Sequence, residues 1–212
     1  MSVEFVLETI ETLLASNNNR MLFIWDSLAL TPAISDIEGD FNPQSSMAVK
    51  ARILAKGLSK LIIPIANSES TFLILNQLKA NITRSPSEAM TTPYMTPGGK
   101  ATIYSYSLRI WLTGRKAKAS FVTDDKGFRV GSEVKVKLEK SRFGTQGRQC
   151  NFKILWGNKI GIQDDESLFD AISSSESLKR LGAWYELHDA DGNAIGSKFQ
   201  STKWTDRMKD DV

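Results

Sequence analysis

Two short apolar runs, each followed at once by polar residues, constrain the fold of this chain most strongly. Residues 21–25 are followed by Asp26, and residues 71–75 are followed by Asn76 and Gln77. Continuous apolar runs of this length are typical of strands that are buried on both faces of a parallel sheet. Because ligands bind at the carboxyl ends of such strands, the polar residues predict a site at one edge of the sheet.

Helical periodicity surrounds these two runs. Apolar residues recur at helical spacing in Val3–Leu14 and again in Met47–Ile63, and the polar stretch 32–46 before the second helix predicts a loop. A helix between two strands is the connection that parallel strands require. The first part of the chain is therefore predicted to be an α/β core.

The middle of the chain predicts a long loop and then more strands. Lys79–Gly99 has no periodicity, and loops of this length are usually functional or disordered. Strand patterns follow at Ile103–Leu112, Glu133–Leu138 and Cys150–Trp156, with turn-rich segments between them. These patterns predict an antiparallel extension of the parallel sheet.

The last fifty residues predict a small α+β subdomain. A helix pattern runs from Ser167 to about Leu181, and two strand patterns, 184–187 and 195–199, flank an Asp-Ala-Asp-Gly-Asn turn. We therefore expect a core of residues 1–161 followed by a subdomain of residues 162–212.

Composition excludes some classes of protein. The net charge of +3 permits a nucleic-acid partner without requiring one. One cysteine and one histidine leave no material for an internal disulfide, a cysteine-rich zinc site or a multi-histidine metal site, which fits a reducing cytoplasm. No apolar run reaches the roughly 20 residues that span a bilayer, and we expect no membrane partner.

Several segments, in order, resemble the RecA family of DNA strand-exchange recombinases and its phage UvsX-type members. The segments MLFIWDSLALTP and DIEGD are similar to a nucleotide-site strand and the first DNA loop, and FLILNQLKANI to the strand before the second DNA loop. The segment TPGGKATIYSYSLRI is similar to the end of that loop, and GAWYELHDADGNAIG to a hairpin near the family's carboxyl terminus. The resemblance implies a partial RecA-type core, with parallel central strands extended by antiparallel strands, and a small α+β carboxy-terminal subdomain.

The sequence departs from this family at the phosphate-binding loop. The family binds ATP and Mg²⁺ through a glycine-rich loop that ends in Gly-Lys-Ser/Thr and opens a helix. Gly98, Gly99 and Lys100 come nearest, but Tyr94 stands in place of the first glycine, Ala101 in place of the hydroxyl residue, and a strand is predicted next. We expect that this chain alone neither binds nor hydrolyses ATP. A piece of a longer protein, a split gene and a truncated reading frame all fit this pattern.

The resemblance implies nucleotide roles for several residues. Asp26, beside Ser27, corresponds to the acidic residue that orients water around the Mg²⁺ of the bound nucleotide, and Gln77 to the sensor of the terminal phosphate. Lys140 and Arg142 correspond to basic residues that reach the phosphates held by the neighbouring subunit, so they are also interface residues. From the residues alone, the alternative interpretation of Asp26 is a residue that caps a strand end, and that of Gln77 is a polar strand end solvated at the sheet edge.

Two aromatic residues have alternative interpretations. The resemblance assigns Tyr104 to the subunit interface and Trp156 to the surroundings of the neighbour's adenine. The alternative interpretation of both is an ordinary aromatic residue on a strand, and for Trp156 core packing explains the residue nearly as well.

The resemblance also implies DNA contacts in two loops. Basic residues would hold phosphates and apolar residues would grip a stretched strand, although a basic helix face is more often simply solvated. The predicted DNA-binding residues are Met47, Lys50, Arg52, Lys56, Lys79, Ile82, Arg84, Gly98, Gly99 and Lys100.

The function implied by the resemblance is homologous recombination and DNA repair. The chain is expected to bind single-stranded and double-stranded DNA, to self-associate into an ATP-dependent helical filament, and to need a Walker A-containing half for DNA-dependent ATP hydrolysis. The alternative is a catalytically inactive RecA-fold protein that caps or modulates a recombinase filament; a RecA-fold helicase is disfavoured by the Gly-Ala-Trp-Tyr hairpin. The expected location is the cytoplasm of a bacterium or a phage-infected host.

Overall fold

The chain folds into two compact units, Met1–Tyr106 and Ser107–Val212, and each is described by itself. The predicted boundary between residues 161 and 162 therefore falls inside the second unit. The computed structural model describes residues 1–16, 19–40, 48–82, 85, 87, 90, 92, 94–114, 120–156, 160–173 and 175–210.

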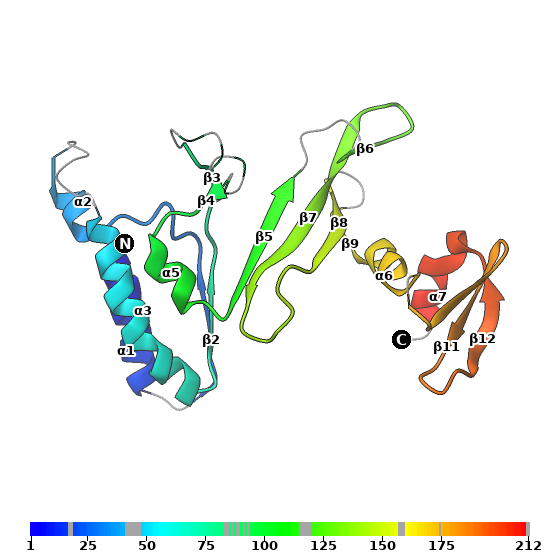
Figure 1. Ribbon diagram of the computed structural model, residues 1–212, viewed down its shortest axis with the longest axis horizontal. Helices are drawn as coiled ribbons and strands as arrows, with labels where there is room; N and C mark the ends of the chain where they lie inside the picture. Colours follow the sequence, from blue (N-terminus) through cyan, green and yellow to red (C-terminus); the bar gives the residue numbers. More distant parts are fainter. Residues whose placement is uncertain are drawn as a thin grey trace. The chain divides into compact units, whose positions relative to one another are not determined.

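The first unit combines helices with short strands (Figure 1). Its elements are α1 (Val3–Ser16), β1 (Leu22–Trp25), α2 (Ile34–Glu38), α3 (Val49–Asn67), β2 (Thr71–Ile74), β3 (Lys79–Ala80), β4 (Tyr94–Met95) and α5 (Lys100–Ser105).

Strands β1 and β2 pair in parallel, as predicted, with Trp25 opposite Ile74. Helices α1 and α3 pack together and cover one face of this pair (Figure 1). Trp25 stacks on Phe72 at 6.2 Å between ring centres. The buried side chains of the resulting core are Val3, Leu7, Ile10, Trp25, Leu28, Leu54, Leu58 and Leu61.

The second unit contains a five-stranded antiparallel sheet with the path β5-β7-β8-β9, in which β6 also pairs with β7. Its antiparallel pairing agrees with the prediction, but no pairing of this sheet with β1 or β2 occurs among the described residues, so its predicted role as an extension of the parallel sheet stays a prediction. Its strands are β5 (Leu108–Gly114), β6 (Phe121–Thr123), β7 (Arg129–Ser141), β8 (Gln149–Leu155) and β9 (Gly161–Gln163).

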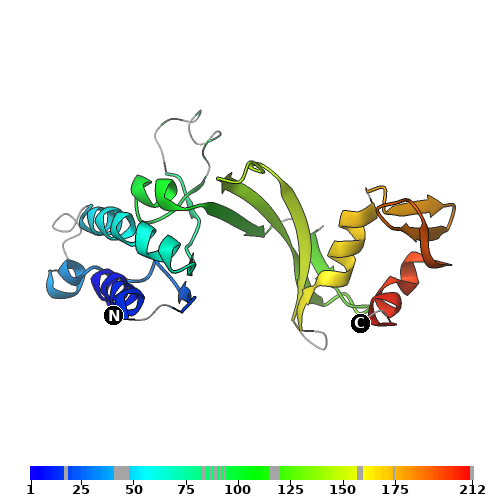
Figure 2. The same ribbon diagram turned by 90° about the horizontal axis from the view of Figure 1, so that it is seen from below.

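The end of the chain forms a three-stranded antiparallel sheet, β10-β11-β12, with α6 and α7 beside it (Figure 2). Leu178, Phe199 and Trp204 are its buried residues, and Phe169 packs on the Trp204 ring. The elements are α6 (Asp164–Ser173), β10 (Leu178–Leu181), β11 (Trp184–His188), β12 (Ala194–Phe199), the 3₁₀ turn η2 (Ser201–Lys203) and α7 (Trp204–Asp210).

Two predicted elements were wrong in part. The strand predicted from Ile103 begins only at β5, because residues 100–105 form α5, whose Thr102 side chain is buried and donates to the Gly99 carbonyl at 2.7 Å. The helix predicted for 167–181 ends at Ser173. The Ser175 hydroxyl donates to the Ile172 carbonyl at 2.7 Å and accepts from the Ser177 amide, and such bonds compete with a helix.

Candidate functional site

The turn after β1 is fixed by hydrogen bonds and presents Asp26 at the surface. The buried Trp25 indole donates to the Thr31 hydroxyl at 2.9 Å, and this hydroxyl donates to the Ser27 carbonyl at 2.9 Å. The Leu28 amide donates to the Leu75 carbonyl at 3.0 Å, which ties the turn to the chain just after β2. The Asp26 side chain is exposed, and the peptide bond to Ser27 is cis.

The polar residues after β2 lie beside this turn, so the two strand ends meet at one edge as the sequence predicted. Gln77 is exposed, and its backbone N–H donates to the Asn76 Oδ1 at 2.9 Å. The side-chain nitrogen Nδ2 of Asn76 donates to the Pro97 carbonyl at 2.9 Å. Asn76 therefore connects the strand end to the distant glycine pair.

The sequence identified Asn76 as a polar strand end but did not reveal this linking role. Its signal was present, because an Asn directly after an apolar strand is a polar side chain without an obvious solvent role.

The glycine pair packs against the same turn and against α3. Gly98 has φ +106°, and a Cβ there would lie 2.9 Å from the Leu28 side chain. Gly99 has φ +77°, and a Cβ there would lie 2.9 Å from the Cβ of Ala51. Only glycine combines this backbone with this close approach. Gly98 thus serves as a packing point inside the first unit.

Lys100 follows as an exposed residue at the start of α5. A phosphate-binding loop is followed by a helix, and the sequence instead predicted a strand after Lys100. The structure has a helix there, so this argument against a phosphate-binding loop no longer holds. The substitutions at Tyr94 and Ala101 remain.

Basic residues on α3 differ sharply in their surroundings. The Lys50 ammonium donates to the carbonyls of Leu28 at 2.7 Å and Ala29 at 3.3 Å, so it holds α3 to the turn after Asp26. Burial lowers the pKa of Lys50; the Asp36 carboxylate opposes this shift and the Lys79 charge adds to it.

Arg52 and Lys56 are exposed farther along the same helix, where they are available to an outside partner. Lys60 forms an ion pair with Glu11 at 2.6 Å. Met47 and Arg84, also predicted to contact DNA, lie outside the described residues.

The segment predicted as the second DNA loop is closed at its base by a short ladder. Lys79 pairs with Met95 and Ala80 with Tyr94, and the Asn81 side chain donates to the Thr92 carbonyl at 3.0 Å. Ile82 is 96% exposed.

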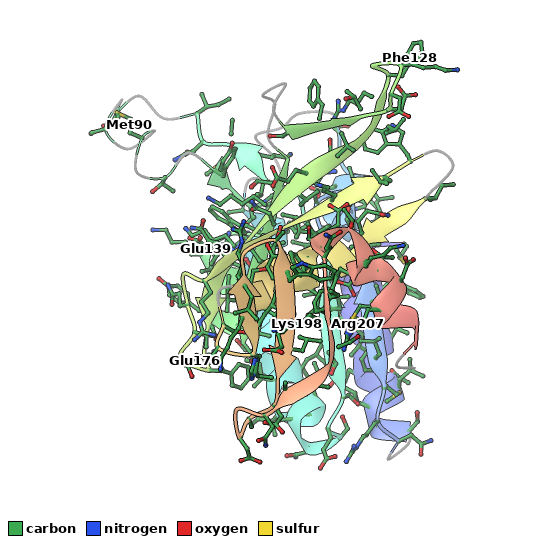
Figure 3. The ribbon with its side chains drawn as sticks, turned by 90° about the vertical axis from the view of Figure 1, so that its right-hand side faces the viewer. Met90, Phe128, Glu139, Glu176, Lys198 and Arg207 are labelled. Carbon is green, nitrogen blue, oxygen red and sulfur yellow. The ribbon has the colours of Figure 1, made fainter. Side chains whose placement is uncertain are left out.

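Met90, which the sequence reasoning missed, is also strongly exposed in this segment (Figure 3). An apolar residue inside an aperiodic polar stretch was the available signal. The loop therefore has two exposed apolar side chains, Ile82 and Met90, and a basic residue, Lys79, in the ladder at its base.

Lys140 and Arg142 stand at the end of β7 in the second unit, opposite the start of β5. Lys140 pairs with Arg109 across the ladder, and the Arg142 amide donates to the Ser107 carbonyl at 3.0 Å. Burial lowers the pKa of Lys140, and the charges of Arg142 and Arg109 lower it further. Three cationic groups are thus held close enough to repel one another, an arrangement that favours an anionic partner.

The two predicted interface aromatics are exposed. Tyr104 lies on α5 with 70% of its surface exposed, so it is a helix residue and not the strand residue that was expected. Trp156 follows β8 and is 45% exposed, with the Arg129 guanidinium 5.2 Å from its ring centre. Core packing, the alternative interpretation of Trp156, is therefore wrong.

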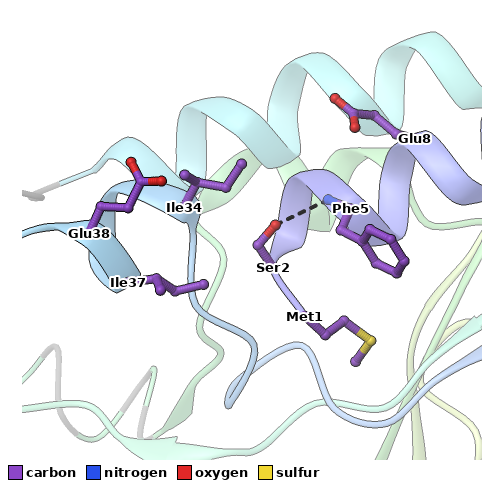
Figure 4. Close-up of a pocket in the computed structure, with 7 residues that line it drawn as sticks. All are labelled: Met1, Ser2, Phe5, Glu8, Ile34, Ile37 and Glu38. Atoms are coloured by element: carbon purple, nitrogen blue, oxygen red, sulfur yellow. Dashed lines mark hydrogen bonds between the residues drawn. The ribbon is translucent and has the colours of Figure 1, made fainter.

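Two pockets, each of about 370 Å³, lie away from the predicted residues. The first is formed by the ends of α1 and α2, where the Phe5 amide donates to the Ser2 hydroxyl at 3.2 Å (Figure 4). The second lies between β8, α6 and the start of α7. No predicted nucleotide or DNA residue lines either pocket.

The described part of the chain shows neither a metal centre nor a membrane span. It contains no group of three or more His, Cys, Asp or Glu side chains that could hold a metal ion, so Asp26 is not part of an acidic cluster. None of the described helices combines the length and the apolar character that crossing a membrane demands.

Comparison with known proteins gives a consistent result. Residues 2–162 match the family model of the RecA N-terminal domain. The chain is 31% identical to Protein RecA of Leptospira biflexa over 193 residues, which is 91% of this chain and 46% of that protein. It is 30% identical to Protein RecA of Leptospira meyeri (94% and 48%) and 29% identical to that of Francisella philomiragia (94% and 51%). The chain spans about half the length of these relatives.

Proposed function

The chain belongs to the RecA family, and from this premise we propose that it is a DNA-binding recombination module. It binds single-stranded DNA through the segment closed by β3 and β4 and through the exposed face of α3, and it assembles with other subunits on DNA for strand exchange. Hydrolysis of ATP belongs to the assembly that also contains a phosphate-binding loop.

One observation carries the proposal: the two strand ends and the DNA-loop candidate are tied into one hydrogen-bonded unit. Leu28 bonds to Leu75, and Asn76 bonds to Pro97 next to the glycine pair. A change at either strand end therefore has a direct path to the base of the loop. Coupling of this kind is what a nucleotide-controlled DNA loop requires.

The residues present do not by themselves fit a nucleotide with its Mg²⁺. Asp26 is one exposed carboxylate outside any acidic cluster in the described residues, whereas Mg²⁺ needs several oxygen ligands and phosphate needs a cradle of backbone amides. We therefore assign no nucleotide step to this chain alone. Lys140, Arg142 and Arg109 are suited to contact the phosphates of a nucleotide held by a neighbouring subunit.

Binding of fluorescent single-stranded DNA at several salt concentrations tests the proposal. We expect sequence-tolerant binding that weakens as salt rises, because cations that neutralise phosphates release counterions. Changing Arg52, Lys56, Lys79 and Arg84 together to Ala should flatten the log–log salt slope by roughly 0.7 for each phosphate that is no longer neutralised. Lys60→Ala, on the same helix but paired with Glu11, is the matched control and should leave the slope unchanged. An unchanged slope in the fourfold variant excludes this surface.

A second candidate function is favoured by Asp26, an exposed carboxylate that belongs to no acidic cluster in the described residues. We propose as the alternative that the protein caps or modulates a filament of a complete recombinase. Adding this protein to a filament of a complete recombinase distinguishes the two candidate functions. A capping protein lowers the ATPase rate at a ratio of about one molecule per filament end, whereas a module that assembles along the filament acts in proportion to subunits.

A further inference from the structure

The start of α3 carries a lysine at a position that a helix ordinarily disfavours. The amino-terminal end of the helix dipole is positive, so acidic side chains stabilise the first turn and basic ones do not. Lys50 is the second residue of α3, and the first turn contains no acidic residue. Ala48, just before the helix, has a φ of +65°, which costs energy for any residue with a Cβ, and its methyl group cannot cap the helix. The start of α3 therefore depends on contacts with other segments of the first unit.

Lys50 itself makes such a contact. Its ammonium donates to two backbone carbonyls of the turn after Asp26, those of Leu28 at 2.7 Å and Ala29 at 3.3 Å. Hydrogen bonds with a charged donor are stronger than neutral ones, and they offset the partial removal of the ammonium from water. Leu28 is fully buried and its amide is bonded to the Leu75 carbonyl, so the turn is a fixed part of the core. Lys50 thus ties the first turn of α3 to that core.

Charges from both predicted DNA loops lie near this lysine. Burial lowers the pKa of Lys50; Asp36, in the DIEGD segment, opposes the shift, and Lys79, at the base of the second loop, adds to it. The next residue along α3, Ala51, packs against the glycine pair, because a Cβ on Gly99 would lie 2.9 Å from the Ala51 Cβ. The first turn of α3 is therefore the point where the turn after β1 and both predicted DNA loops come together.

We propose that Lys50 is a positioning residue for DNA binding, which holds the first turn of α3 in place and leaves the phosphates to Arg52 and Lys56. The inference rests on the proposed function, because it concerns how the exposed side of α3 is presented to a single strand. Arg52 and Lys56 are exposed and four residues apart, so they share one side of the helix. Lys50 precedes Arg52 by two residues and points to a different side, toward the turn.

Positioning and direct contact have different signatures in DNA binding. A lysine that neutralises a phosphate releases counterions, so its loss flattens the log–log dependence of affinity on salt by roughly 0.7 for a single strand. A positioning lysine releases none. Its loss means that the first turn of α3 has to be ordered when DNA binds, which lowers the affinity by the same factor at every salt concentration.

The first measurement compares three variants in the binding of fluorescein-labelled oligo(dT) over a series of salt concentrations. Lys50→Met removes the donors but keeps an unbranched side chain of similar helix propensity. It should weaken binding by about tenfold, the loss expected for hydrogen bonds of a charged group, without changing the slope. Lys50→Arg keeps donors for both carbonyls and should restore most of the affinity. Lys56→Met, at an exposed position of the same helix, is the matched control and should flatten the slope by roughly 0.7.

The second measurement needs no variant. The side-chain Nζ signals of the wild-type lysines are followed by NMR while oligo(dT) is added. The Lys56 signal should shift as DNA binds, whereas the Lys50 signal should stay unchanged, because the carbonyls of Leu28 and Ala29 retain the ammonium. This measurement decides the inference if Lys50→Met does not fold.

Hydrogen–deuterium exchange without DNA tests the contact separately from the function. Peptides covering residues 26–31 and 48–55 should exchange faster in Lys50→Met than in the wild type or in Lys50→Arg. Peptides covering β11 and β12 in the second unit are the reference and should not change.

Four results overturn the inference: a slope that flattens in Lys50→Met as it does in Lys56→Met, wild-type affinity of Lys50→Met at every salt concentration, an affinity that Lys50→Arg does not restore, or a Lys50 signal that shifts with DNA as much as that of Lys56. Failure of the wild-type chain to bind oligo(dT) removes the proposed function, and the DNA role of Lys50 with it. Faster exchange in Lys50→Met then still establishes the tie between α3 and the turn. Normal wild-type binding together with any of the four results removes the inference alone.

Discussion

The parallel strand pair of the first unit and the five-stranded sheet of the second unit differ in how they are stabilised. The parallel pair β1–β2 is short, but two helices bury one of its faces and create a core that includes Trp25 and Leu54. The five-stranded sheet of the second unit is longer and better paired, yet no apolar side chain in its described strands is buried. The first therefore depends on side-chain burial and the second on backbone ladders and cross-strand pairs. A short strand pair can carry a core that a large sheet lacks.

The largest expected effect tests the core directly. Leu54 is fully buried, and Leu54→Ala should lower the free energy of unfolding of the first unit by about 2–5 kcal/mol, because apolar burial is removed and a cavity is left. Leu112→Ala on β5, where the leucine is 59% exposed, should change stability by less than about 0.5 kcal/mol. Urea unfolding monitored by hydrogen exchange in each unit measures both, and equal destabilisation would remove the distinction between the sheets.

A second prediction tests whether the five-stranded sheet, which lacks a core of its own, instead positions residues that contribute to ATP hydrolysis. In an assembly completed with a phosphate-binding segment, Lys140→Ala or Arg142→Ala should slow DNA-stimulated ATP hydrolysis by about a hundredfold, or roughly 2.7 kcal/mol of barrier. ATP binding should persist, because the phosphate cradle lies on another subunit. Lys153→Ala on β8, where the lysine contacts Glu166, is the control and should be neutral.

Mixing two inactive proteins sharpens this prediction. One carries a substitution of the phosphate-loop lysine in the added segment, and the other lacks both Lys140 and Arg142. Recovered hydrolysis in mixed assemblies supports a site shared between neighbours. If the two proteins assemble together and no hydrolysis returns, the residues do not act across the interface.

A smaller effect compares two glycines with positive φ. Gly98→Ala should destabilise the first unit by about 2 kcal/mol, because the new Cβ meets Leu28 in a backbone conformation that already disfavours it. Gly127→Ala in the second unit has nothing within 4 Å and should show only the backbone cost of about 1 kcal/mol. Thermal melting of both variants measures the difference, which should vanish if the glycine pair is not packed.

The smallest effects are the pKa changes of two lysines, one in each unit. Asp36→Asn should lower the pKa of Lys50 further, whereas Arg142→Gln should raise the pKa of Lys140, because the first removes attraction and the second removes repulsion. Titration of the lysine side-chain signals by NMR measures both shifts, and shifts of the same sign would contradict the assigned causes.

These lowered pKa values also predict a pH dependence. Between each lowered folded-state pKa and the ordinary value of 10.5, the unfolded chain binds more protons than the folded chain. The contribution of Lys50 and Lys140 to the free energy of unfolding therefore rises as pH increases through that window. Replacement by Met should remove this part of the slope in urea unfolding measured as the pH is raised toward 10.5.

Prediction from the sequence succeeded where a pattern was local and failed where packing decided. The apolar runs before Asp26 and Gln77 correctly indicated parallel strands with polar ends at one edge. The helix at residues 100–105 was missed because burial of Thr102 and the approach of Gly98 to Leu28, which select it, are long-range contacts. The sequence predicted the same DNA-binding role for Lys50 and Arg52. Periodicity does not reveal that the Lys50 ammonium donates to the carbonyl of Leu28.

The clamp formed by β3, β4 and Asn81 has an entropic consequence for the loop that it closes. Lys79 and Ala80 are already paired with Met95 and Tyr94, so the residues that flank this loop on either side are held together before any ligand arrives. The closure entropy of the loop has then been given up during folding. A ligand that binds this segment does not have to bring Ala80 and Tyr94 together, so its association costs less conformational entropy than with an unclosed segment of equal length.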